Sequence, residues 1–120
     1  MDFETIIQEQ PEIIFIDEGN LNTVKQDFDK DPGKYCQLTA FQSGKIYGTL
    51  PYNYYHTNIA VALADAYYMG KVLYPDHFGD VNPELKADEI FQAFLGKPLY
   101  EQYKEAYGGF KNLSEMFRCE

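Results

Sequence analysis

The apolar positions of the chain fall into two patterns, short continuous runs and longer stripes at helical spacing. The runs EIIFID (12–17) and KIYGTL (45–50) are rich in β-branched and aromatic residues, which predicts strands buried on both faces. Residues 21–44 between them have a mostly helical pattern that is interrupted at residues 31–33. A strand, a helical crossover and a second strand form a βαβ unit, so the two strands are predicted to be parallel.

Further helices are predicted on both sides of this unit. They cover residues 2–10 before Pro11, 57–75 up to Pro75, 83–95 between the N-cap residue Asn82 and Gly96, and 98–109 with its Gly-Gly stop. The pattern in 57–75 aligns an apolar face made of Ile59, Leu63, Ala66, Gly70 and Leu73. The tail, residues 110–120, has no clear pattern.

The predicted fold class is α/β: a three-layer, partial Rossmann-like lobe with a short parallel sheet, followed by several C-terminal helices. A length of 120 residues suits a single domain over residues 1–120. Parallel strands that are apolar on both faces need more sheet beside them. We therefore expect this domain to be incomplete, with an exposed sheet edge beside residues 12–17 and self-association through that edge.

Composition and charge exclude several classes of protein. With 45% apolar and 17% aromatic residues, the chain is too hydrophobic to be disordered. Nineteen carboxylates against ten cations give a net charge of −9, which argues against a nucleic-acid binder. Arg118 is the only arginine, so bidentate recognition of an anion is not expected in the body of the chain. The sequence has no apolar stretch long enough for a membrane span and no signal-peptide pattern.

The two cysteines and the absence of catalytic motifs lead to two negative predictions. Cys36 and Cys119 lie 83 residues apart without a CxxC motif. A disulfide framework would need more cysteines, so both are predicted to be thiols.

A nucleophile elbow, a P-loop and a GxGxxG fingerprint are all missing from the sequence. We therefore predict no catalytic residue, no cofactor and no enzymatic activity.

Candidate ligand-binding residues come from the loops that follow the two predicted strands. In an open parallel sheet, ligands bind beyond the carboxyl ends of the strands, which here lead into DEGN (17–20) and PYNYYHTN (51–58). Tyrosine offers a flat apolar ring and a polar hydroxyl, which suits a large ring-bearing ligand. The candidates are Tyr52, Tyr54, Tyr55, His56, Glu18 and Asn20. The alternative is that the tyrosines pack against helix ends without a ligand.

His56 is also considered as a metal ligand. Asp17 and Glu18 could supply oxygen ligands beside its imidazole, but the spacing matches no metal-binding motif. A solvated histidine or a helix cap is the interpretation that we favour, so no metal site is predicted.

Three segments in a fixed order resemble a known family. Pro11 to Phe15 follows a glutamate-bearing helix and opens a strand, Ala40 to Pro51 reads AFQSGKIYGTLP, and Leu73 to Pro75 ends a long helix with LYP. Together they resemble the C-terminal lobe of ABC-transporter substrate-binding proteins. The matching class has a rigid helical backbone between its lobes and serves iron–siderophore, haem and cobalamin uptake. The resemblance covers Asp2 to Phe110.

The resemblance implies binding without catalysis. The chain would be the solute-binding component of an importer for an iron complex or a cobalamin-like ligand, extracytoplasmic, and present as a C-terminal lobe without its N-terminal lobe. Its partners would be a small-molecule metal chelate and the ABC permease subunits. Glu4 lies seven residues before Pro11, where the family carries a surface glutamate that docks onto permease arginines. The alternative from the same residues is a solvated glutamate in a first helical turn.

Two other functions remain open at this point. One is a small protein–protein interaction domain with a tyrosine-rich surface and no role in transport. The other is a subunit of an α/β enzyme that is related only by its fold. No candidate active site in the sequence supports this second function.

Overall fold

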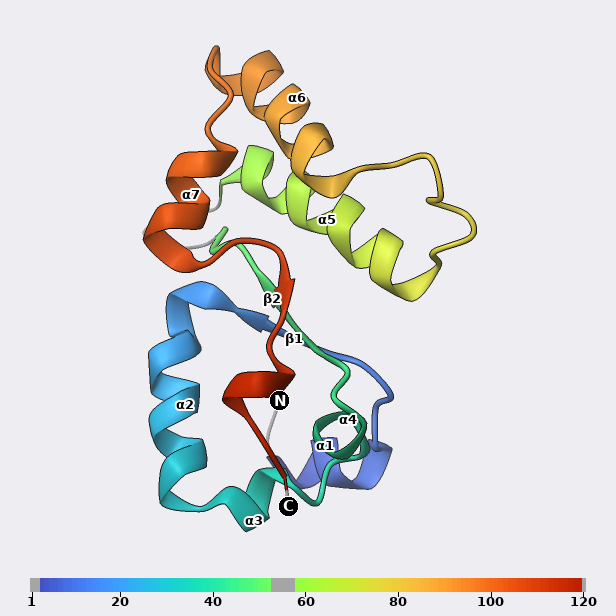
Figure 1. Cartoon of the computed structure of the whole chain (residues 1–120), viewed down its shortest axis with the longest axis vertical. Helices are drawn as coiled ribbons and strands as arrows, with labels where there is room; N and C mark the ends of the chain where they lie inside the picture. The colour runs from blue at the N-terminus through green and yellow to red at the C-terminus, as the bar shows by residue number, and fades with distance from the viewer. Residues whose placement is uncertain (1–2, 53–57, 120) are drawn as a thin grey trace.

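The computed structural model describes residues 3–52 and 58–119, which form a mixed α/β structure (Figure 1). The elements in chain order are α1 (Phe3–Glu9), β1 (Ile14–Asp17), the 3-10 turn η1 (Glu18–Asn20), α2 (Leu21–Lys30), α3 (Pro32–Tyr35), α4 (Thr39–Ser43), β2 (Ile46–Thr49), α5 (Ile59–Leu73), α6 (Pro83–Leu95), α7 (Tyr100–Tyr107), β3 (Lys111–Asn112) and the 3-10 turn η2 (Ser114–Met116). The two predicted strands and the predicted helices are therefore present. Among the described residues, none of the helices is both long and apolar enough to cross a bilayer.

The sheet has three strands in the order β1-β2-β3. β1 and β2 are parallel, as predicted, with Ile14 opposite Ile46 and Ile16 opposite Gly48. β3 pairs antiparallel to β2, with Lys111 opposite Gly48, so the sheet is mixed where a purely parallel sheet was expected. The third strand comes from the tail that showed no pattern, because two residues are too few for an alternation to be visible. β1 lies at the edge of the described sheet, as the sequence predicted.

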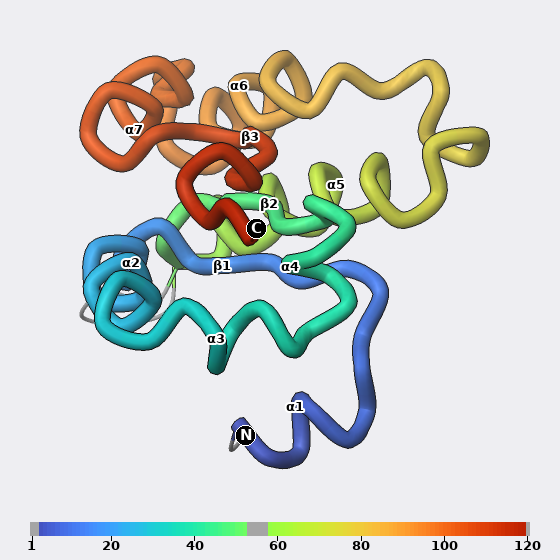
Figure 2. The backbone as a smooth tube through the Cα atoms, turned by 60° about the horizontal axis from the view of Figure 1, so that its bottom comes forward, coloured from blue at the N-terminus to red at the C-terminus, as the bar shows by residue number. Residues whose placement is uncertain are grey.

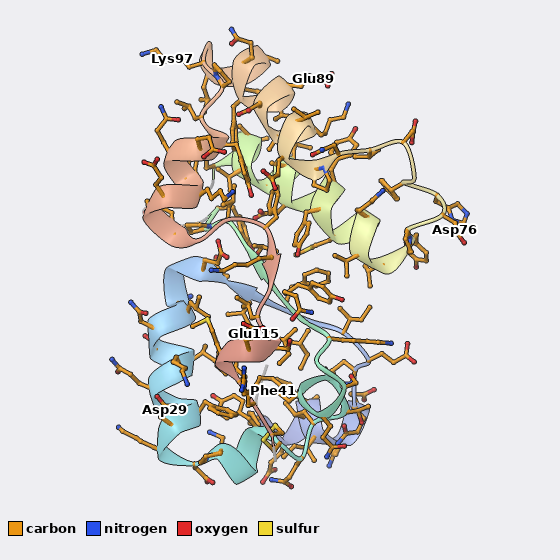
Figure 3. The ribbon with its side chains drawn as sticks, in the orientation of Figure 1. Asp29, Phe41, Asp76, Glu89, Lys97 and Glu115 are labelled. Carbon is orange, nitrogen blue, oxygen red and sulfur yellow. A yellow bond between two sulfur atoms is a disulfide. The ribbon has the colours of Figure 1, made fainter. Side chains whose placement is uncertain are left out.

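The helices lie on both sides of the sheet (Figures 1 and 2). On the side of α1–α4, side chains from β1 and β2 join a core of Ile16, Leu21, Phe28, Leu38, Phe41, Ile46, Leu113 and Phe117. A second core lies among α5–α7 and contains Leu50, Ala60, Val61, Ala64, Ala87, Phe91 and Tyr100. In Figure 3, Phe41 lies inside the first of these groups, whereas Asp76 and Lys97 are on exposed loops and Glu89 is on the exposed side of α6.

Local capping explains where several helices begin and end. The Asn82 side chain accepts hydrogen bonds from the backbone N–H groups of Glu84 and Leu85 at 3.0 and 3.2 Å, with Pro83 in the first turn. Gly96 ends α6 with a left-handed φ of 78°, a conformation that glycine adopts without strain. The predicted boundaries of this helix are confirmed.

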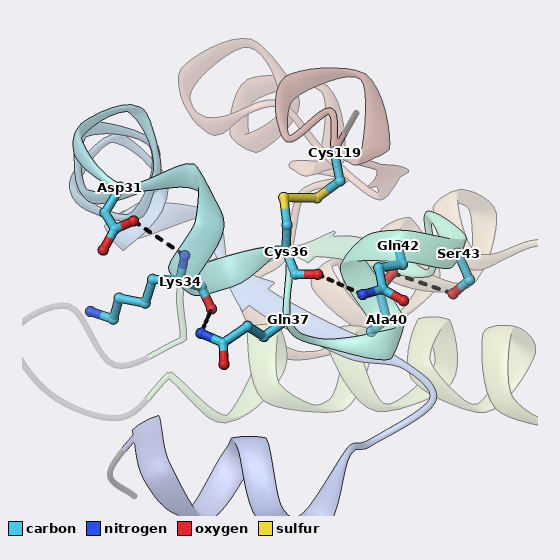
Figure 4. The surroundings of a disulfide bond; sticks show 8 residues. All are labelled: Asp31, Lys34, Cys36, Gln37, Ala40, Gln42, Ser43 and Cys119. Atoms are coloured by element: carbon cyan, nitrogen blue, oxygen red, sulfur yellow. Dashed lines mark hydrogen bonds between the residues drawn. A yellow bond between two sulfur atoms is a disulfide. The ribbon is translucent and has the colours of Figure 1, made fainter.

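Cys36 and Cys119 form a disulfide, so the prediction of two thiols was wrong (Figure 4). Cys36 follows α3, and its carbonyl accepts a hydrogen bond from Gln42 Nε2 at 2.7 Å. The tail returns to this side of the sheet, where Phe117 packs edge-on against Phe28 at 5.3 Å between ring centroids. The 83-residue separation in sequence therefore becomes a Cα–Cα distance of 5.7 Å.

Candidate functional site

The two predicted ligand loops meet at the carboxyl ends of β1 and β2. The Asp17 carboxylate accepts a hydrogen bond from the Gly19 backbone N–H at 2.8 Å, which turns the chain immediately after β1. A side chain on Gly19 would place its Cβ 3.1 Å from the Pro51 Cβ, so the first loop lies directly against the start of the second. Tyr52 follows Pro51 and is 44% exposed. An aromatic ring therefore borders the junction of the two loops.

The structure places the other candidate residues in different surroundings. Asn20 is exposed, and its side chain makes no capping bond to α2. Glu18 is buried, with only 5% of its surface exposed, so it faces the interior and not a shared open surface with Tyr52. Tyr54, Tyr55 and His56 lie outside the described residues. Glu4 is exposed in the first turn of α1.

Glu18 occupies a space that glycines leave open. A Cβ on Gly48 of β2 would clash with Glu18 Oε2, and one on Gly108 would lie 3.3 Å from the same oxygen. Burial raises the pKa of Glu18 to about 8, and the Gly109 backbone amide and the Lys111 ammonium oppose this rise. Neither carboxyl oxygen has a partner with hydrogen-bonding geometry among the described residues, so the Gly109 amide acts on Glu18 without a well-formed hydrogen bond. Because a buried unpaired carboxylate is costly, the protonated form is favoured at neutral pH.

Asp65 is a second buried carboxyl near the same edge, and the sequence did not identify it. It lies on α5, is 4% exposed, and accepts a hydrogen bond from the Leu50 backbone N–H at 2.9 Å, immediately after β2. Burial raises the pKa of Asp65 to about 8, with smaller contributions from the negative charges of Asp17 and Glu18. Its other oxygen has no described partner. The sequence feature that could have identified Asp65 is its position as a single carboxylate within the apolar run IAVALADAYYM.

Two tyrosines complete the surroundings of Glu18. Burial raises the pKa of Tyr68 well above its ordinary value and that of Tyr100 to about 12, and the charge of Glu18 contributes to both rises. The Tyr100 hydroxyl accepts a hydrogen bond from the Phe110 backbone N–H at 2.9 Å. Tyr68 stacks on the Phe110 ring at 4.5 Å between centroids. We call Glu18, Asp65, Tyr68 and Tyr100 the buried acid cluster.

Burial favours the protonated form of both carboxyls in the cluster, Glu18 and Asp65. Within residues 3–52 and 58–119, no three His, Cys, Asp or Glu side chains are grouped so that they could hold a metal ion. The arrangement can instead couple the two strand ends to α5 and to the segment before β3, in a manner sensitive to protonation.

A separate open pocket of about 380 Å³ lies beside α5 and the start of α6. Its lining is formed by Tyr68, Lys71, Val81, Asn82, Pro83, Glu84 and Phe110, none of which belongs to the two loops. The Lys71 ammonium that borders it already donates a hydrogen bond to the Phe78 carbonyl at 2.9 Å. The pocket thus offers no convergent set of free polar groups.

Comparison with known proteins identifies no relative, because no family model matches the chain and no curated protein sequence matches it significantly.

Proposed function

We propose that this chain is the C-terminal lobe of an extracytoplasmic solute-binding protein that serves an ABC importer for an iron complex or a cobalamin-like ligand. The proposal rests on the resemblance of Pro11 to Phe15, Ala40 to Pro51 and Leu73 to Pro75 to that family. The observation that carries it is the meeting of the two loops at Gly19 and Pro51, with the Tyr52 ring exposed beside them. Such a position suits one wall of a ligand cleft.

Further features of the described residues support this proposal. β1 and β2 are parallel and are joined through α2–α4, which is compatible with a Rossmann-like lobe. The Cys36–Cys119 disulfide fits an oxidising compartment outside the cytoplasm. The free edge of β1 offers a position for further strands or for self-association. In this role the chain binds and does not catalyse, and nucleic acid is not a partner.

The ligand would contact the exposed aromatic surface of the second loop. A tyrosine ring that stacks on a planar or apolar part of a ligand contributes about 1–3 kcal/mol. Within the proposed cleft, Tyr52 and the neighbouring Tyr54, Tyr55 and His56 would supply the ring contacts, and Asn20 would supply polar contacts. Because Glu18 is buried, its part would be to hold the loop after β1 in place.

The test is calorimetric titration with a ferric hydroxamate siderophore, haemin and cyanocobalamin. A two-lobe protein that contains this chain should bind one of them, and the 120-residue chain alone should bind it weakly or not at all, because one lobe cannot enclose it. Tyr52→Ala should weaken binding about 5- to 100-fold, as should Tyr54→Ala or Tyr55→Ala if that ring stacks. The control is Tyr74→Ala, since Tyr74 is 60% exposed and follows α5, away from the loops. Equal affinities for Tyr52→Ala and Tyr74→Ala would remove Tyr52 from the cleft.

A second candidate function is a protein–protein interaction domain. It is favoured by the number of large apolar side chains that α5 and α6 expose, among them Leu63, Leu73, Leu85 and Phe94. If none of the three ligands binds to any form of the protein, this function becomes the better explanation of the surface.

A further inference from the structure

Helix α5 is apolar on the side that faces away from the protein as well as on the side that faces the core. Its inner side buries Ala60, Val61, Ala64, Asp65 and Tyr68. The opposite side exposes Ile59 by 57%, Leu63 by 38% and Leu73 by 45%. We call this second side the outer face of α5, and it consists of Ile59, Ala62, Leu63, Ala66, Met69, Gly70 and Leu73. Helices that are apolar all round are normally buried, so the outer face requires a cover.

The outer face carries no charge in a chain whose net charge is −9. The two charged residues of α5 do not contribute to it. Asp65 is buried on the inner side, and the Lys71 ammonium donates to the carbonyls of Phe78 and Gly79. A partner for this face must therefore itself be apolar and uncharged where it touches α5. A second copy of the chain meets that requirement and brings no charged group to the contact.

The order of side-chain sizes on the outer face is symmetric about Ala66. Residues three positions away on either side are large (Leu63 and Met69), those four positions away are small (Ala62 and Gly70), and those seven positions away are large (Ile59 and Leu73). In an antiparallel pair centred on Ala66, residues at equal distances from this centre face each other. Leu63 then meets Met69, Ile59 meets Leu73, and Ala62 meets Gly70 together with the Phe78 ring that lies against it. Matching residues on the two copies give the self-complementarity that a two-fold interface requires.

The surface beside Ala66 is also hollowed. Gly70 leaves space for the Phe78 ring, since a Cβ at Gly70 would lie 2.5 Å from that ring. Phe78, Tyr67 and Ala66 line an open apolar pocket of about 340 Å³. In the antiparallel pair the Phe78 ring beside Gly70 lies opposite Ala62 of the second copy, whose small side chain leaves room for the ring.

We propose that the outer face of α5 is a dimer interface, in which two copies pair antiparallel with their two-fold axis at Ala66. Fifteen residues of helix extend over about 22 Å, so the contact lies at the small end of specific interfaces. The dimer is therefore weak, with a dissociation constant on the order of 10–100 μM. This surface is different from the proposed ligand cleft and from the free edge of β1.

Sedimentation of the 120-residue chain over a range of concentrations tests the interface. The chain should form a reversible dimer, and Ala66→Glu should raise the dissociation constant at least about tenfold because two charges would meet at the axis. Ala106→Glu is the matched control, since Ala106 is an exposed alanine on α7 and its substitution should leave the constant unchanged. Circular dichroism confirms that each variant is folded. A chain that stays monomeric at millimolar concentration overturns the proposal. A dimer that is insensitive to Ala66→Glu also overturns it, because the contact would then lie elsewhere, for example at β1.

Cysteine cross-linking tests the symmetry independently. No free cysteine is present among the described residues, so an introduced thiol reports on its own position. Ala66→Cys should form a covalent dimer on mild oxidation, because each residue at the axis faces its own copy. Ile59→Cys mixed with Leu73→Cys should give a mixed covalent dimer, whereas either variant alone should give little. Efficient cross-linking of Leu73→Cys with itself would indicate a parallel arrangement and would overturn the antiparallel pair.

Discussion

At the scale of single residues, the most unusual feature is the pair of buried carboxyls, Glu18 and Asp65. Each is at most 5% exposed, and three of their four oxygens have no described hydrogen-bonding partner. Glu18 belongs to a loop that the parallel-strand rule identified, so the sequence could predict its position. It could not predict its burial, which depends on the space left by Gly48 and Gly108 on distant segments. Asp65 was not predictable, because the apolar face that the sequence aligned on α5, from Ile59 to Leu73, lies on the exposed side and Asp65 lies on the buried side.

These carboxyls predict how stability depends on pH. Their pKa values rise from 4.5 and 3.8 to about 8 in the folded protein. Below about pH 4 the folded and unfolded states both carry these protons, and the full contribution to stability is present. As pH rises towards 8, the unfolded chain loses protons that the folded protein keeps, so the free energy of unfolding falls. Each group contributes at most about 1.4 kcal/mol per pH unit to this slope.

Urea unfolding of Glu18→Gln and Asp65→Asn between pH 5 and 8.5 checks this expectation. Both variants should show a smaller loss of stability with rising pH than the unmodified chain, because an amide does not titrate. Glu105→Gln, at an exposed position of α7, is the control and should retain the original slope. If the slope of both buried variants equals that of the control, the carboxyls are not protonated in the folded protein.

At the scale of elements, the sequence predicted most of the helices because their boundaries depend on local chemistry. Asn82 and Gly96 set the two ends of α6 by capping, which involves only neighbouring residues. The strands β1 and β2 were visible as apolar runs. β3 was not visible, because its two residues become a strand only through pairing with Tyr47 and Gly48. Local signals thus identified local structure, and long-range pairing remained hidden.

The cap of α6 gives a prediction with an internal control. The Asn82 side chain accepts two backbone hydrogen bonds, so Asn82→Ala should lower the free energy of unfolding by about 1 kcal/mol. Asn20 stands at the corresponding position of α2 but makes no side-chain capping bond, so Asn20→Ala should change stability by less than about 0.5 kcal/mol. Chemical denaturation measures both. Equal losses in the two variants would mean that the cap bonds of Asn82 do not stabilise α6.

At the scale of the whole molecule, the disulfide joins the end of α3 to the last described residue of the tail. Removal of the disulfide by Cys36→Ala and Cys119→Ala should lower the free energy of unfolding by about 2–4 kcal/mol, because the unfolded chain is no longer closed into a long loop. Thermal unfolding of this variant and of the oxidised chain measures the difference, and addition of a reductant to the unmodified chain should reproduce it. Unchanged stability after reduction would show that packing of tail residues such as Leu113 and Phe117 holds the tail without the disulfide.

The proposed docking of Glu4 onto an ABC permease also concerns the whole molecule, because it requires a surface that faces away from the ligand. Glu4 is exposed on α1, and the proposed ligand contacts lie in the loops after β1 and β2. An exposed carboxylate that meets a basic permease pocket would fix the register of the complex and speed encounter. In the transporter reconstituted with the two-lobe protein, Glu4→Arg should therefore abolish stimulated ATP hydrolysis and leave ligand affinity unchanged. Glu105→Arg makes the same charge change on α7 and should preserve both. Transport that survives Glu4→Arg would identify Glu4 as ordinary helix surface, where a first-turn glutamate is favoured by the helix dipole alone.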